Sequence, residues 1–236
     1  MNRLLQLTAK VQGNVLLAFD FPFGYPTGSK IGGGRRAAEL LSQHLTSSDT
    51  DKNNRFEVAD ILNRKMFDAP GPFWGHPKAM TFQNLTWSKP AFLHDGFKEW
   101  RHAEHHLKAA GHRIMNVWQL LGQGSVGSQT LTGLAALYDF SQKVEIKERI
   151  SFWPFDTDWD RSLDGIILAE VWPSLNDYNQ VDHPIKDARQ VLACLDALLQ
   201  QNKENEIRPL FAAPMCLNEE ERAQCLREEG WILSVV

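Results

Sequence analysis

Residues 14–26 read NVLLAFDFPFGYP, an apolar run that ends on Asp20 and breaks into an aromatic turn with a glycine and two prolines. The near-continuous apolar residues 15–19 predict a strand that is buried on both faces of a sheet. The prolines and the glycine predict that the strand stops within a few residues. Asp20 then lies at the carboxyl end of a buried strand, where open α/β sheets bind their ligands. A solvated strand-end aspartate or a cap in the turn explains the same residues.

Residues 165–174, GIILAEVWPS, repeat this design with an apolar strand, a carboxylate and then an aromatic residue and a proline. Counting by two places Glu170 on one face of the strand together with Ile166, Leu168 and Trp172. A charged glutamate within such a strand is costly unless it is paired or binds a cation. Two explanations follow: Glu170 is a functional carboxylate, or it forms a salt bridge with a buried arginine or lysine.

A third acid, Asp187, lies in the first part of residues 182–201, which predict a long amphipathic helix with Asp182 as its N-cap. The helical stripe of this segment consists of Val191, Leu192, Leu195, Leu198 and Leu199. Asp187 precedes Val191 by one turn, so the spacing places it on the side that faces the core. An acid in a first turn also stabilises the helix dipole, which is the plain structural interpretation.

Two glycine-rich segments allow other functions. Residues 27–34, TGSKIGGG, precede Arg35, Arg36 and a helical pattern, so they could bind a phosphate at a helix N-terminus. They lack the GxxxxGK[ST] pattern, and a mobile surface loop is the favoured interpretation. Residues Gly122–Gly127 match GxGxxG, with Glu145 placed where a ribose-binding acid would fall. The alternative is a tight turn that leads into a helix of small residues.

Composition is that of an ordinary globular protein: 236 residues, 43% hydrophobic and 23% charged. The net charge of −4 disfavours a broadly basic nucleic-acid surface. Cys194, Cys216 and Cys225 are odd in number and form no CxxC, so neither a disulfide framework nor a zinc site is indicated. No apolar run is long enough for a membrane span, and no signal-peptide pattern is found, so a cytoplasmic protein is predicted.

Several motifs together resemble an uncharacterised bacterial family of the RNase H-like, predicted-nuclease superfamily. They are FDFPFGYP at 19–26, VWQLLGQGSVGSQTLTGL at 117–134, WPF at 153–155, AEVWPS at 169–174, HPIKDA at 183–188 and EEGWIL at 228–233. The resemblance implies one α/β domain over residues 1–236, with a mixed sheet flanked by helices. It also implies an irregular Trp/Pro-rich and helical insertion at about 47–143.

The resemblance further implies a catalytic site at the carboxyl end of the sheet. Asp20, Glu170 and Asp187 would be its catalytic acids and would bind one or two Mg²⁺ or Mn²⁺ ions, since clustered carboxylates suit these cations. Such a metal pair can activate water for phosphodiester hydrolysis.

Three basic residues complete that implied site. Arg35, Arg36 and Lys186 would orient the phosphates of a nucleic acid or nucleotide. The family also implies an earlier strand pair whose first strand carries an Asp–Trp–Ser-like motif, which this sequence does not contain. The prediction is therefore a divalent-metal-dependent phosphodiesterase or nuclease, or a degenerate relative of one.

Two alternatives stay open. One is a non-catalytic module that binds a nucleotide or a phosphorylated cofactor through the glycine-rich segments, and the other is an NAD(P)-dependent oxidoreductase built on Gly122–Gly127. A sheet edge without a partner strand would also favour a homo-oligomer.

Overall fold

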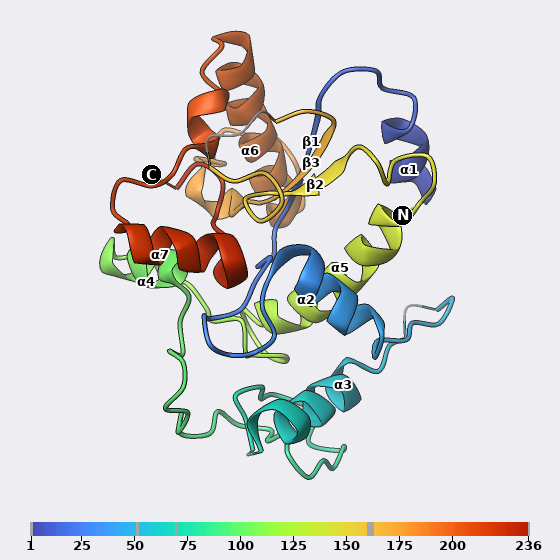
Figure 1. Ribbon diagram of the computed structural model, residues 1–236, viewed down its shortest axis with the longest axis vertical. Coiled ribbons are helices and arrows are strands. Elements are labelled where there is room, and N and C mark those ends of the chain that lie inside the picture. Colours follow the sequence, from blue (N-terminus) through green and yellow to red (C-terminus); the bar gives the residue numbers. More distant parts are fainter. Residues whose placement is uncertain (1, 51, 69, 160–162, 236) are drawn as a thin grey trace.

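A small parallel sheet is the centre of the computed structural model (Figure 1). The structure describes residues 2–50, 52–68, 70–159 and 163–235. Strands β1 (Val15–Phe19) and β2 (Ile150–Phe152) both pair with β3 (Ile166–Glu170), which gives the order β1-β3-β2. Both pairs are parallel, and Phe19 lies opposite Glu170. The segments that follow β1 and β3 therefore both start at the carboxyl end of the sheet.

One face of the sheet is covered by α2 (Gly34–Ser42) and α5 (Val126–Ser141), which pack against each other. Because strand side chains alternate, Val15, Leu17 and Phe19 all point to this face. They pack against a cluster of buried residues that includes Ile166, Leu168, Leu131 and Leu134. Helix α5 lies within the predicted insertion, yet it packs directly in this main core.

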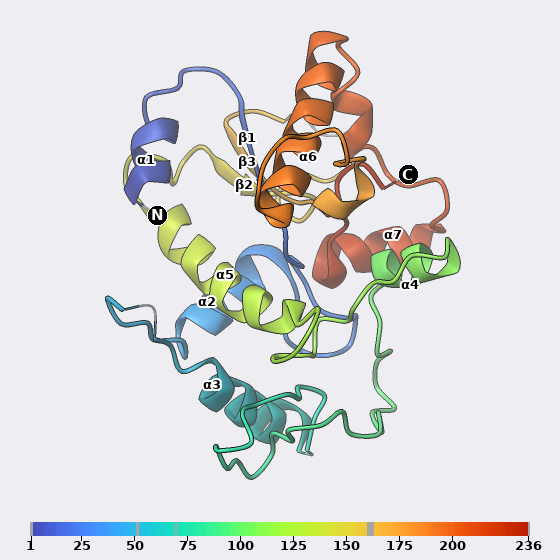
Figure 2. The same ribbon diagram turned by 180° about the vertical axis from the view of Figure 1, so that it is seen from behind.

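The opposite face is covered by α6 (Lys186–Lys203) and by the C-terminal segment (Figures 1 and 2). Ile167 and Ala169 of β3 are buried here with Trp231, and Leu16 of β1 packs at the margin. The prediction of an α/β fold with helices on both faces of a sheet is thus confirmed at the level of layers.

The remaining helices surround this centre. They are α1 (Asn2–Thr8), α3 (Arg55–Leu62), α4 (His102–Ala109) and α7 (Glu219–Gln224). A π-helical turn extends α3 at Asn63–Phe67 and another extends α7 at Cys225–Glu229. Separate 3-10 turns lie at Pro173–Leu175 and Arg208–Phe211. Helices α4 and α7 lie side by side in both views (Figures 1 and 2). None of these helices, as far as the chain is described, is long and apolar enough to cross a membrane.

Two sequence expectations need correction. The sheet was expected to be mixed, but all pairings between its described strands are parallel. Strand β1 has the predicted position but not the predicted burial, because its residues are half-buried and Ala18 is exposed. The physical reason is that β1 is an edge strand and α6 covers it only loosely, whereas β3 in the middle of the sheet is fully buried.

Candidate functional site

Asp20 follows β1 directly and lies at the carboxyl end of the sheet, as the sequence predicts. The residue keeps part of its surface exposed, but protein surrounds enough of its carboxyl group that burial raises its pKa to about 6. The charges of Glu170 and Asp187 add to this rise in pKa. Among the described residues, Asp20 has no hydrogen-bond or ion-pair partner. It is therefore a charged group whose surroundings favour its neutral form.

Glu170, the last residue of β3, is buried and fully engaged by Arg101. The two guanidinium nitrogens donate to its two carboxylate oxygens at 2.7 and 2.8 Å. The backbone N–H of Phe23 donates to the same carboxylate at 3.0 Å, which fixes the turn after Asp20. Of the two explanations from the sequence, the structure contains the salt bridge to a buried arginine.

Arg101 is the centre of a buried network that no pattern in the sequence indicates. Besides Glu170, its guanidinium donates to Glu104 at 3.0 Å and to the backbone carbonyl of Glu229 at 2.9 Å. Burial alone would lower the pKa of Arg101, but the carboxylates of Glu170 and Glu104 raise it above its ordinary value. This network joins the end of β3 to α4 and to the C-terminal segment, so it stabilises the carboxyl end of the sheet, where Asp20 lies.

Asp187 lies in the first turn of α6 and is exposed. Its charge adds to the raised pKa of Asp20, after burial and the charge of Glu170. Across the parts of the chain that the structure describes, no three His, Cys, Asp or Glu side chains group closely enough to hold a metal ion. The three acids thus share one end of the sheet, and their metal role stays a prediction.

The basic residues proposed for phosphate contact lie on two different helices, α2 and α6. Arg35 donates to Ser141, to the carbonyl of Ile150 and to Asp156, so it connects α2 to the other elements of the core. Arg36 is exposed on α2, and Lys186 is exposed at the start of α6. Of the three, Lys186 alone shares a helix turn with one of the acids.

The glycines at 32–34 are buried and not part of a mobile surface loop. A Cβ atom at Gly33 would lie 2.3 Å from both the backbone oxygen of Glu228 and the ring of Phe155. The N-terminus of α2 is therefore filled by protein, and these glycines are needed for close packing.

Gly122–Gly127 also has a structural explanation. The segment before it contains no strand, only an isolated bridge at Gln119, and α5 follows it. A Cβ atom at Gly127 would lie 2.5 Å from the carbonyl oxygen of Val117. The strand–turn–helix context of a dinucleotide site is thus missing, and the tight turn into a helix, the alternative from the sequence, is what the structure contains.

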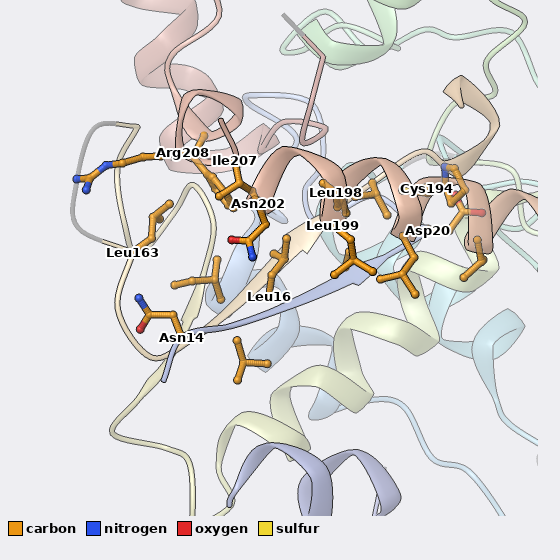
Figure 3. Close-up of a pocket in the computed structure, with 18 of the residues that line it drawn as sticks. Asn14, Leu16, Asp20, Leu163, Cys194, Leu198, Leu199, Asn202, Ile207 and Arg208 are labelled. Atoms are coloured by element: carbon orange, nitrogen blue, oxygen red, sulfur yellow. The ribbon is translucent and has the colours of Figure 1, made fainter. Parts of the chain in front are cut away.

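A cavity of about 630 Å³ lies between the sheet and α6 (Figure 3). Its walls are mainly aliphatic and include Leu16, Ala18, Ile167, Leu195, Leu198 and Leu199. Asp20 and Cys194 lie at one end of it, and Asn14, Asn202 and Arg208 lie at the other (Figure 3). The cavity therefore runs along β1, with the carboxylate of Asp20 at the carboxyl end of the sheet.

This cavity exists because the apolar stripe of α6 does not pack closely against the sheet. Val191, Leu195 and Leu199 keep 53%, 48% and 46% of their surfaces exposed, and of the whole helix only Ala193 and Cys194 are buried. A helix usually buries such a stripe against its own core. The sequence showed the stripe, but periodicity cannot show what covers it.

Comparisons with protein-family models, with curated proteins and with solved structures found no match to this chain.

Proposed function

We propose that the chain is a binding protein for a small molecule, and that its site is the cavity between the sheet and α6. The observation that carries this proposal is the unpaired carboxyl group of Asp20 at the end of a mainly aliphatic cavity of about 630 Å³. Ligand sites are typically clefts of about 300–1,000 Å³ with apolar walls and a few polar groups that fix orientation. The non-catalytic module considered from the sequence was a different one, because it would bind a nucleotide or a phosphorylated cofactor through the glycine-rich segments.

Two unfavourable free-energy contributions at this position, from exposed apolar surface and from a carboxylate without a partner in the described residues, support a ligand here. Exposed leucines on α6 and a half-buried Leu16 leave apolar surface in contact with water, and covering it is worth roughly 25 cal/mol per Å². Asp20 loses hydration without gaining a partner. A molecule with an apolar body and one group complementary to a carboxylate would relieve both costs.

Nile red, an uncharged dye that fluoresces in apolar surroundings, tests this proposal. Wild-type protein is expected to bind the dye saturably at one site, whereas Ala18→Trp fills the cavity and abolishes binding. Ala110→Trp, at the exposed end of α4, is the matched control and should bind like wild type. Equal binding by the Ala18→Trp variant, or no saturable binding at all, would contradict the proposal.

A divalent-metal-dependent phosphodiesterase of the RNase H-like superfamily is the second candidate. The specific observation in its favour is that Glu170 and Asp187 both raise the pKa of Asp20, so three acids share one end of the sheet. The donor set fits a metal only in part, because Arg101 engages both oxygens of Glu170. Asp20 and Asp187 would hold Mg²⁺ or Mn²⁺, with nucleic-acid or nucleotide phosphates as further ligands.

Calorimetric titration with Mn²⁺ separates the two candidates. If the protein is a metal-dependent phosphodiesterase, Mn²⁺ should bind to the wild type, and Asp20→Asn and Asp187→Asn should each weaken that binding. If wild type and both variants show no binding heat, the metal site is ruled out and the small-molecule site is unaffected.

Two broader proposals accompany these candidates. The free thiols of Cys194, Cys216 and Cys225 support a reducing compartment, and we place the protein in the cytoplasm. Within the described sheet, β1 pairs only with β3, and this free edge supports self-association as a homo-oligomer.

A further inference from the structure

The electrostatic character of the cavity end selects the sign of a ligand's charge. Glu170 and Asp187 both act on Asp20 as negative charges, and Asp20 in turn raises the pKa of Cys194, after the larger effect of burial. The guanidinium of Arg101 is committed to Glu170, Glu104 and a backbone carbonyl. A carboxylate or phosphate would meet repulsion at this end, whereas a cation would meet an unpaired carboxylate.

The aliphatic walls of the cavity determine which chemical group can follow the charged group of a ligand. In Figure 3, Leu16 of β1 faces Leu198 and Leu199 of α6 across the cavity, with Asp20 beyond them. The four residue steps from Leu16 to Asp20 span about 13 Å, since a strand rises about 3.3 Å per residue. Along that length the walls offer aliphatic contacts and few hydrogen-bonding groups, which disfavours a sugar or a polyamine and favours an alkyl chain.

The far end is open and polar. Asn14, Asn202 and Arg208 line it and are all exposed. A chain that enters with its charged group at Asp20 can therefore extend toward solvent at this end, so the cavity fixes the head of the ligand and not its full length.

We propose that the ligand is an aliphatic amine, with its protonated nitrogen on the carboxylate of Asp20 and its alkyl chain between β1 and α6. This inference rests on the proposed small-molecule site and specifies the chemical class that the site accepts. An ammonium group donates to Asp20, which has no other partner in the described parts of the chain, and the alkyl chain covers the exposed stripe of α6. An alkyl amine keeps its charge at pH 8, since its pKa is close to that of a lysine side chain, about 10.4.

Displacement of Nile red by octylamine, octanol and octanoate at pH 8 tests the inference, because these molecules share a chain and differ in the head group. Octylamine is expected to displace the dye at least tenfold more tightly than octanol, and octanoate is expected to be the weakest. In Asp20→Asn the advantage of octylamine over octanol should disappear while octanol binding is retained. Asp139→Asn, an exposed position on α5, is the matched control and should keep the advantage.

The outcomes separate the inference from the function on which it rests. If octanol competes as well as octylamine in wild type, or if Asp20→Asn leaves their ratio unchanged, the amine assignment is overturned and the cavity remains a ligand site. If neither the dye nor any of the three compounds binds, the proposed function fails, and the amine assignment fails with it.

Discussion

Replacing Asp20 with asparagine should stabilise the protein at neutral pH and not at acid pH. The pKa of Asp20 rises from 3.8 to about 6 on folding, so between roughly pH 4 and pH 6 the folded state holds a proton that the unfolded state has lost. Stability therefore falls as the pH rises through this window, and it stays reduced above it. Asparagine does not titrate, so the variant escapes this loss.

The size of the gain follows from the same shift in pKa. About two pKa units correspond to roughly 3 kcal/mol, because each unit is worth 1.36 kcal/mol. Asp20 remains partly exposed, and solvent screening reduces the expected gain in the free energy of unfolding to about 1–2 kcal/mol. At pH 4 the folded wild type is already protonated, so the two proteins should differ by only a few tenths of a kcal/mol.

Urea denaturation of both proteins at pH 4 and pH 7.5 measures this difference. Asp187→Asn is a useful companion, because it removes one of the charges that raise the pKa of Asp20 and should give a smaller gain. An Asp20→Asn variant that is no more stable than wild type at pH 7.5, or equally stabilised at both pH values, would show that folding does not raise the pKa of Asp20. The expected pattern is that of a functional site, where a residue retained for binding lowers stability.

Other predictions concern the groups that hold the site in place. Glu170→Gln should lower the free energy of unfolding by about 1.5–3 kcal/mol, because it weakens the charge-assisted hydrogen bonds from Arg101, while Glu104 still balances the buried charge of that guanidinium. The exposed Glu145→Gln should change stability little, and equal stabilities of the two variants in urea would count against the buried network. Gly33→Ala should lower the midpoint of thermal unfolding strongly, since its new Cβ would lie 2.3 Å from two neighbouring atoms. Gly13→Ala, with open space around it, is the control. Similar midpoints for the two variants would show that Gly33 is not closely packed.

The sequence predicted those parts of the fold that depend on local pattern. The apolar run at Val15–Phe19 predicted β1 within its observed bounds, and the repeat of that pattern predicted β3 and its terminal Glu170. The parallel pairing of these strands places Asp20 and Glu170 at the carboxyl end of the sheet, as expected of strands with similar endings. The amphipathic period predicted the existence of α6, but the helix begins at Lys186 and not at residue 182, so its predicted start was wrong.

The parts that the sequence did not predict depend on contacts between distant segments. Arg101 lies 69 residues from Glu170, and nothing in its local sequence indicates that it is buried. The stripe of α6 has the period of a buried helix face, but only the packing shows that Leu195 and Leu199 are half exposed beside a cavity. Glycines such as Gly33 serve close packing as readily as phosphate binding, so composition alone could not distinguish the two.

The most direct test of the central claim is a map of backbone amide NMR shifts as octylamine is added to the wild-type protein. If an aliphatic amine binds at Asp20, saturable shifts are expected at the cavity residues Leu16, Ala18 and Leu198, and these shifts should be lost in Asp20→Asn. Shifts confined to other regions, such as the turn at 32–34 or Gly122–Gly127, or the absence of any saturable shift, would contradict binding of the amine at Asp20.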